Sequence, residues 1–158
     1  MKKSLAVIFL ITCSIIGTIL ACGAPTQLVT INVNEDLAAQ TLDESADSFK
    51  GTDWVFSYDR VELQKDLMRV HGSFKYEEQP AVNGYLDTAF SVAVGSLQTE
   101  LLNENFGDFH PAEDDLMVLI DTIEQVFKDA IAGDKNAVIY VSVEMIEDLI
   151  KVQIRFLP

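Results

Sequence analysis

The segment that most constrains the fold lies after Gly107, between Pro111 and Gly133, where apolar side chains recur at the three- and four-residue spacing of an α-helix. Pro111 suits its first turn, the acidic residues that follow complement the helix dipole, and Gly133 can end it. Glu124 is expected on the solvent side. The apolar positions form a broad face that must pack on another layer, so we expect a long helix covering a sheet. They are Leu116, Leu119, Ile120, Ile123, Val126, Phe127, Ala130 and Ile131.

In the N-terminal part of the domain, the sequence predicts a strand followed by a shorter helix. Residues 28–33 alternate apolar and polar side chains, which predicts a strand with one buried face. Asn34 can cap the helix that follows, and its apolar stripe extends to Phe49. We expect Lys50-Gly51 to end this helix.

The middle third predicts antiparallel strands. Between Trp54 and Leu63 the apolar phase reverses, which indicates a β-bulge near Asp59-Arg60, and Gln64-Lys65-Asp66 is the expected turn. The next strand has one core face and one wet face. The core face carries Met68, Val70, Gly72, Phe74 and Tyr76, and the wet face carries Arg69, His71, Ser73 and Lys75.

Further strands complete the predicted sheet. After Asn83-Gly84 an apolar alternation runs to Val94, and Gly95-Ser96 can turn the chain into another strand. Two last strands are expected over residues 137–143 and 149–156, separated by residues 144–148. This order predicts an α+β domain in which a curved antiparallel sheet has the long helix and the shorter N-terminal helix packed on one face.

The charge of the chain restricts its partners. The 158 residues carry a net charge of −14, and two of the eleven basic residues stand at the very start. Nucleic acids bind through Lys and Arg that neutralise phosphates, so we expect no nucleic-acid partner. Anionic lipid head groups should repel the chain for the same reason.

The start of the chain has the parts of a secretory signal: a basic segment, an apolar run from Leu5 to Leu20 and a small residue before a cysteine. Ile19-Leu20-Ala21-Cys22 resembles the lipobox of bacterial lipoproteins. The resemblance implies cleavage before Cys22 and diacylglyceryl modification of its thiol. Cys13 fits less well, because Thr12 stands at the small-residue position. The alternative is an uncleaved transmembrane anchor, although the run is just under the roughly 17–25 residues that span a bilayer.

The lipobox reading divides the chain into a signal peptide at residues 1–21, a lipidated tether at 22–27 and one domain at 28–158. Acyl chains would then hold the protein in the membrane, each buried CH₂ contributing about 0.8 kcal/mol. We expect an exported, membrane-anchored protein on the extracytoplasmic side. Gly23 follows the cysteine where an aspartate commonly favours inner-membrane retention in such lipoproteins, which leaves the choice of membrane open.

No sequence motif indicates a chemical reaction. We therefore expect that the protein is not an enzyme and that it binds no cofactor and no metal. A catalytic zinc usually needs three protein ligands, and His71 and His110 are more simply a surface and a capping histidine. The acidic pairs Glu77-Glu78, Asp114-Asp115 and Glu147-Asp148 lack the ligand spacing of a calcium loop. Solubility and helix capping explain them.

The large apolar side chains permit a binding site between sheet and helix, the usual form of a small-molecule pocket. The alternative is a packed core, which a domain of this size needs. The candidate ligand-binding residues are Phe74, Tyr76, Phe90, Ile120, Ile123 and Phe127.

A second resemblance concerns the order of elements. Val61-Glu62-Leu63 to Val70-His71-Gly72, then Asn83-Gly84-Tyr85-Leu86, an acidic helix and a terminal strand pair look like small envelope proteins with a tubular-lipid-binding (TULIP-like) fold. In that family a long helix lies along a curved sheet and encloses a lipid-sized groove. The resemblance implies a noncatalytic envelope module for an apolar ligand or lipid. The alternative is a protein-interaction or structural component that uses the wet sheet face or a strand edge.

Overall fold

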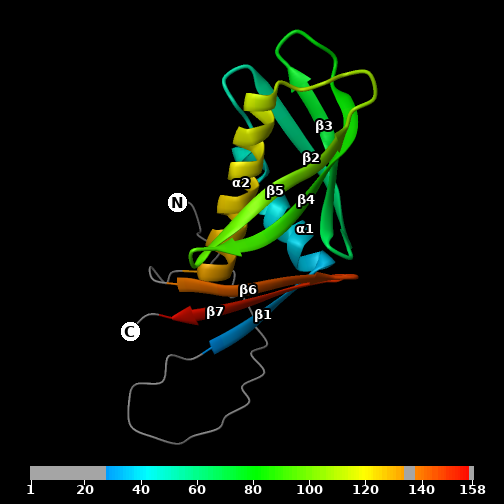
Figure 1. Ribbon diagram of the computed structural model, residues 1–158. Helices are drawn as coiled ribbons and strands as arrows, with labels where there is room; N and C mark the ends of the chain where they lie inside the picture. Colours follow the sequence, from blue (N-terminus) through cyan, green and yellow to red (C-terminus); the bar gives the residue numbers. More distant parts are fainter. Residues whose placement is uncertain (1–27, 134–137, 157–158) are drawn as a thin grey trace, which may run out of the picture.

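The computed structural model describes residues 28–133 and 138–156, and every structural statement below refers to those ranges. The predicted mixture of helices and antiparallel strands is confirmed (Figure 1). The elements are β1 (Leu28–Asn34), α1 (Glu35–Glu44), η1 (Ala46–Ser48), β2 (Trp54–Gln64), β3 (Leu67–Tyr76), β4 (Val82–Ala93), β5 (Ser96–Asn105), α2 (Glu113–Ala132), β6 (Val138–Ile146) and β7 (Leu149–Phe156). Cys13, Cys22 and the tether lie outside the described residues.

The strands form two antiparallel sheets, where the sequence predicts one. The first has the order β2-β3-β4-β5 and the second the order β1-β7-β6. Both edges of the first sheet are occupied: backbone groups of residues 49–51 bond to β2, and a carboxylate of α2 bonds to β5. Strands β1, β7 and β6 pair with one another in the second sheet. Tyr140 N–H donates to the Gly95 carbonyl at 2.9 Å and joins the two sheets.

The N-terminal cap is confirmed, but the first helix is shorter than predicted. The Asn34 side chain accepts a hydrogen bond from Leu37 N–H at 3.0 Å. The helix ends at Glu44 and a short 3₁₀ turn follows, so Phe49 reaches the core from outside the helix. Apolar residues in a 3₁₀ turn have nearly the same spacing as those in an α-helix, so the sequence alone does not show where the α-helix ends.

The predicted bulge and the two faces of β3 are confirmed. The register between β2 and β3 shifts between Tyr58 and Arg60, which brings Phe56 and Val61 to the same buried face. Alternate residues of β3 are buried, and those between them are partly or fully exposed. The sheet therefore has a core face under the helices and an outer face toward solvent.

The last hairpin is tighter than predicted. Strand β6 continues to Ile146, and Glu147-Asp148 form a two-residue turn in which Asp148 has φ 64°. Residues 144–146 therefore belong to the strand, because the chain reverses in two residues where we expected five. On β7, Ile150, Val152 and Ile154 are buried, and Phe156 is half-buried.

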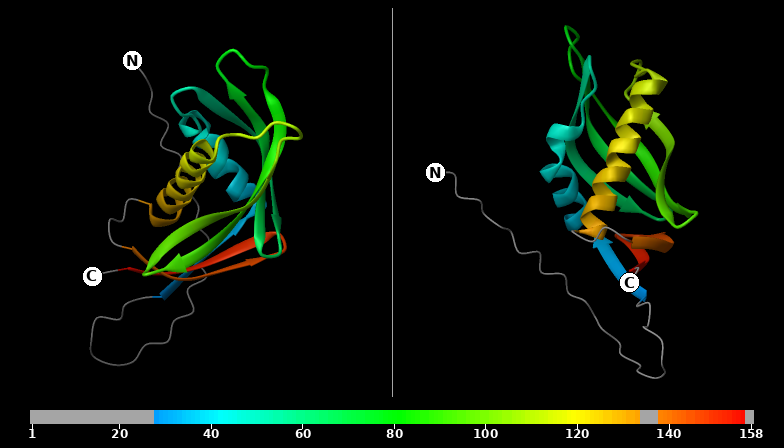
Figure 2. Two further views of the ribbon diagram at one scale, coloured as in Figure 1. Left: turned by 45° about the horizontal axis from the view of Figure 1, so that its top comes forward. Right: turned by 90° about the vertical axis from the view of Figure 1, so that its left-hand side faces the viewer.

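Helix α2 buries most of its predicted face. It contacts β5 and α1, and Figure 2 shows it lying across the four-stranded sheet beside α1. Val126 is half-buried, and Ala130 is exposed, contrary to the prediction. The predicted apolar face was too wide, because the neighbouring layer covers only the side chains in the middle of that face. In the described ranges neither helix is long and apolar enough to span a membrane.

Candidate functional site: the outer face of the four-stranded sheet

The outer face of the four-stranded sheet gathers polar side chains in rows that cross the strands. Strand alternation sends every second side chain to this face, and the register places them opposite one another. The first row is Ser57, Ser73 and Asn83; the second is Arg60, His71, Tyr85 and Asn105; the third is Glu62, Arg69, Asp87 and Asn103. These residues together form the polar face of the sheet.

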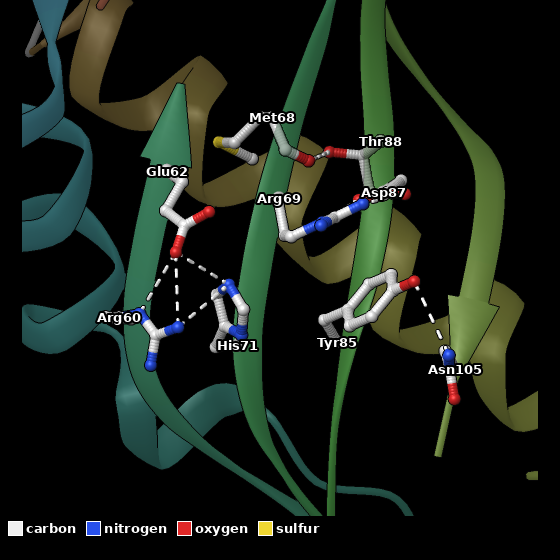
Figure 3. A network of polar contacts seen from close by, with 9 residues as sticks. All are labelled: Arg60, Glu62, Met68, Arg69, His71, Tyr85, Asp87, Thr88 and Asn105. Carbon is white, nitrogen blue, oxygen red and sulfur yellow. Dashed lines mark hydrogen bonds and ion pairs between the residues drawn. The ribbon is translucent and has the colours of Figure 1, made fainter. Parts of the chain in front are cut away.

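Glu62 is the centre of one cluster on the polar face (Figure 3). Arg60 Nε donates to Glu62 Oε1 at 3.2 Å, and His71 Nε2 lies 3.1 Å from the same oxygen. Burial by itself would raise the pKa of Glu62, but the hydrogen bond from Arg60 and the nearby positive groups outweigh it and lower that pKa. Glu62 is therefore held as a carboxylate that fixes two basic side chains.

Arg69 and Asp87 form the second cluster. Arg69 donates to both carboxylate oxygens of Asp87, at 2.7 and 2.9 Å, in a bidentate ion pair. This hydrogen bonding raises the pKa of Arg69. The guanidinium also lies 4.0 Å from the centre of the Tyr85 ring, a cation–π distance. Asp87 is buried, so this pair is fixed on the sheet surface and is not a mobile surface ion pair.

A hollow of about 620 Å³ lies on the polar face. Its wall includes Ser57, Ser73, His71 and Tyr85, so hydroxyl groups, an imidazole and an aromatic ring surround it. The backbone of Gly72 also lines it. The hollow is open to solvent and is lined by polar and apolar atoms together, which suits contact with another protein surface.

A glycine pair on the core side supports this part of the sheet. Gly72 and Gly84 are opposite one another on β3 and β4. A Cβ at Gly72 would lie 2.5 Å from the Phe56 ring, and a Cβ at Gly84 would meet the Phe106 ring. The two rings therefore fill the space beneath the hollow, and only glycine permits their close approach.

The six predicted ligand-binding side chains all point toward the interior between the four-stranded sheet and α2. Five are buried, and Tyr76 is half-buried. The Phe90 and Phe127 ring centres are 4.9 Å apart, and Phe74 packs against Phe106 at 5.8 Å. Large rings in direct contact favour the packed-core alternative. The apolar-ligand hypothesis stays a prediction.

Tyr76 fastens the start of α2 to the sheet. Its hydroxyl donates to Asp115 at 2.5 Å and accepts from Ala112 N–H at 3.1 Å. Burial and then the hydrogen bond to Asp115 raise the pKa of Tyr76. Both contacts give this residue a structural role.

The second hollow, of about 330 Å³, lies at the C-terminal end of α2. Its lining includes Gly95, Lys128 and Tyr140. None of the six predicted ligand-binding residues lines it. The Tyr140 hydroxyl donates to the Lys128 carbonyl at 3.3 Å. Burial, with smaller effects from Asp129 and Glu124, raises the pKa of Tyr140 to about 12.

The histidines and acidic pairs do not gather into a metal site within the described ranges. His71 belongs to the Glu62 cluster, and His110 Nδ1 lies 3.3 Å from Glu104 Oε1 near the start of α2. A pair of such groups lacks the third ligand that a catalytic zinc usually requires.

Sequence reasoning identified the wet face of β3 but missed its partners on the neighbouring strands. Asp87 and Asn105 were not singled out, and Tyr85 was named only for the resemblance to TULIP-like proteins. The available signal was the alternation of charge across three successive strands, with the basic Arg69 between the acidic Glu62 and Asp87. This alternation becomes informative only when the register of the strands is known.

No protein-family model matched the chain, and no match was found among curated proteins or solved structures.

Proposed function

We propose that this protein is an acyl-anchored component of the cell envelope whose domain binds a protein partner through the polar face. The observation that carries the proposal is the combination of balanced charge and fixed side chains on one face of an acidic molecule. The lipobox-like segment ending at Cys22 supports export and anchoring. The partner chemistry that fits is a polar protein surface with groups that donate and accept hydrogen bonds.

Charge balance distinguishes this face from the rest of the chain. Its two arginines, Arg60 and Arg69, are matched by two carboxylates, Glu62 and Asp87. The net charge of −14 therefore resides elsewhere in the sequence. An approaching protein, including another acidic one, meets less repulsion here than at other surfaces.

Fixed side chains lower the cost of association. Arg69 is held by Asp87 and by the Tyr85 ring, so binding immobilises few additional rotamers. Arginine and tyrosine are also among the residues that contribute most to protein interfaces. Because this face has few large apolar groups, the association it supports is polar and reversible.

Binding, not catalysis, is the use that these contacts favour. In the described part of the chain, the polar contacts of His71 go to Glu62 and Arg60 and none to a serine hydroxyl. Nucleophilic catalysis needs a hydroxyl or thiol within hydrogen-bond reach of a base. We therefore assign the cluster a recognition role.

Site-specific photo-crosslinking in cells tests the proposal. A photoreactive side chain at Ser73 on the polar face should capture a defined envelope protein, identified by mass spectrometry. The matched control is Ser91, which is exposed at the far end of the same sheet. With the partner purified, Ser57→Trp should weaken binding by at least about tenfold, and Ser91→Trp should leave it unchanged. Equal capture at both positions, or unchanged affinity of Ser57→Trp, would overturn the proposal.

An apolar ligand between the four-stranded sheet and α2 is the second candidate, because the sheet–helix order resembles lipid-binding envelope proteins. Native mass spectrometry of the purified protein, before and after organic extraction, separates the two candidates. A copurified lipid that is lost on extraction supports the apolar-ligand function. A single protein mass in both samples supports the packed core.

A further inference from the structure

The two sheets have four edge strands among the described residues, and three of them are covered by hydrogen bonds. On β2, Phe56 N–H donates to the Phe49 carbonyl at 2.9 Å. On β5, Thr99 N–H donates to a carboxylate of α2. On β6, a backbone bond joins Tyr140 to the turn between β4 and β5. Covered edges resist pairing with other chains.

The fourth edge strand, β1, has no such cover in the described part of the chain. Its backbone pairing is with β7 alone, so alternate residues direct their N–H and C=O groups away from the sheet. Edge strands in natural proteins usually carry charged residues or proline that discourage pairing. Residues 28–34, Leu-Val-Thr-Ile-Asn-Val-Asn, have neither. Figure 1 shows β1 at the border of its sheet.

The sequence of β1 is self-complementary in the antiparallel sense. If two copies pair about Ile31, Val29 lies opposite Val33 and Thr30 lies opposite Asn32. Opposed residues in an antiparallel pair point to the same face, so the apolar side chains of both copies stay on the core side. Val29 and Ile31 are only half-buried in the single chain and would gain apolar neighbours.

Local charge also favours this edge for self-association. Two copies of a chain with net charge −14 repel each other over most of their surfaces. Strand β1 has no charged residue, and β7 beside it contributes Lys151 and Arg155 without an acidic residue. These strands therefore add no negative charge to the repulsion between two copies.

We propose that β1 pairs antiparallel with β1 of a second copy, joining the two three-stranded sheets into one continuous sheet. The inference is independent of the proposed partner function, because the polar face belongs to the other sheet and stays accessible. The register is centred on Ile31, and Thr30 faces Asn32 of the second copy on the outer side.

Charge pairs test the contact and its register together, by sedimentation of the detergent-purified full chain. Thr30 and Asn32 are both exposed. Thr30→Lys with Asn32→Lys places like charges opposite each other twice and should weaken dimerisation by about tenfold. Thr30→Lys with Asn32→Glu places opposite charges in the same positions and should restore the dimer. Circular dichroism shows whether each variant retains the fold, and all variants share the same anchor and micelle.

Disulfide trapping gives the orientation. A mixture of Thr30→Cys and Asn32→Cys chains should crosslink under mild oxidation, because these positions are directly opposed in the antiparallel register. Thr30→Cys alone should crosslink far less, and Ser142→Cys on β6 controls for the native cysteines. A monomeric wild-type chain, insensitivity to the charge pairs, or equal crosslinking of Thr30→Cys alone would each overturn the proposal.

Discussion

Glu124 on α2 accepts a hydrogen bond from the backbone N–H of Thr99 on β5 at 2.6 Å. Its other carboxylate oxygen lies 2.6 Å from Lys128 Nζ, one turn further along the helix. The Glu124 side chain is only 20 % exposed. A residue expected on the solvent side of the helix therefore closes an edge of the four-stranded sheet.

This contact predicts that Glu124→Ala destabilises the domain by about 1–3 kcal/mol, because a part-buried N–H of Thr99 loses its acceptor. Chemical denaturation measures the change. Gln125→Ala is the control: this exposed neighbour bonds only within the helix and should change stability by under about 0.5 kcal/mol. Equal, small losses in both variants would mean that water satisfies the strand edge.

Gly72 gives a second stability prediction. Its Cβ would lie 2.5 Å from the Phe56 ring and 2.5 Å from the backbone oxygen of Ser57, and the backbone oxygen cannot move aside cheaply. Gly72→Ala should therefore cost about 1–3 kcal/mol in urea unfolding. Ser73→Ala, which changes the next side chain on the outer face, should be close to neutral. A neutral Gly72→Ala would show that the strands can separate here.

Much of the local structure could be predicted because its signal is local. The phase reversal between Trp54 and Leu63 indicated the bulge, and Asn34 indicated the helix start. Each depends on residues within one turn or one strand. The same reasoning predicted correctly which side of β3 is wet.

The features that could not be predicted depend on contacts between distant segments. The edge of β5 at Thr99, for example, is closed by Glu124 of α2, which lies 25 residues away in the chain. The pairing of Arg69 with Asp87 depends on the register of two strands. Ala130 lies on the predicted apolar stripe but is exposed, because the neighbouring layer covers only part of that stripe. The candidate site was therefore predicted as a face and not as a network.

The core beneath α2 predicts large losses on truncation. Ile123 and Phe127 are buried, so replacing either by Ala should destabilise the domain by about 2–5 kcal/mol. Met117 is 51 % exposed on the same helix, and Met117→Ala should have a small effect. Thermal or chemical unfolding compares the three. Small losses at Ile123 and Phe127 would indicate a loosely filled space and would favour the apolar-ligand candidate.

The anchoring prediction concerns Cys22. Cys22→Ala removes the thiol that the lipobox resemblance predicts to be acylated, and the short tether has too little apolar surface to replace acyl chains. The variant should leave the acyl-anchored pool in cell fractionation, as precursor or as released domain. Intact-mass measurement of the wild-type protein should show the added lipid. Acyl chains on the Cys22→Ala protein would contradict the prediction.

Tyr140 predicts how stability responds to alkaline pH. Its pKa rises from 10.0 to about 12 in the folded protein, chiefly because its hydroxyl is buried. The unfolded chain releases this proton at lower pH than the folded chain, so the contribution of Tyr140 is complete below pH 10 and is lost as pH rises through about 12. Denaturation across that range should show a steeper decline for wild type than for Tyr140→Phe. The difference in phenolate absorbance between the two proteins should titrate near 12, and a difference titrating near 10 would show that the hydroxyl is exposed.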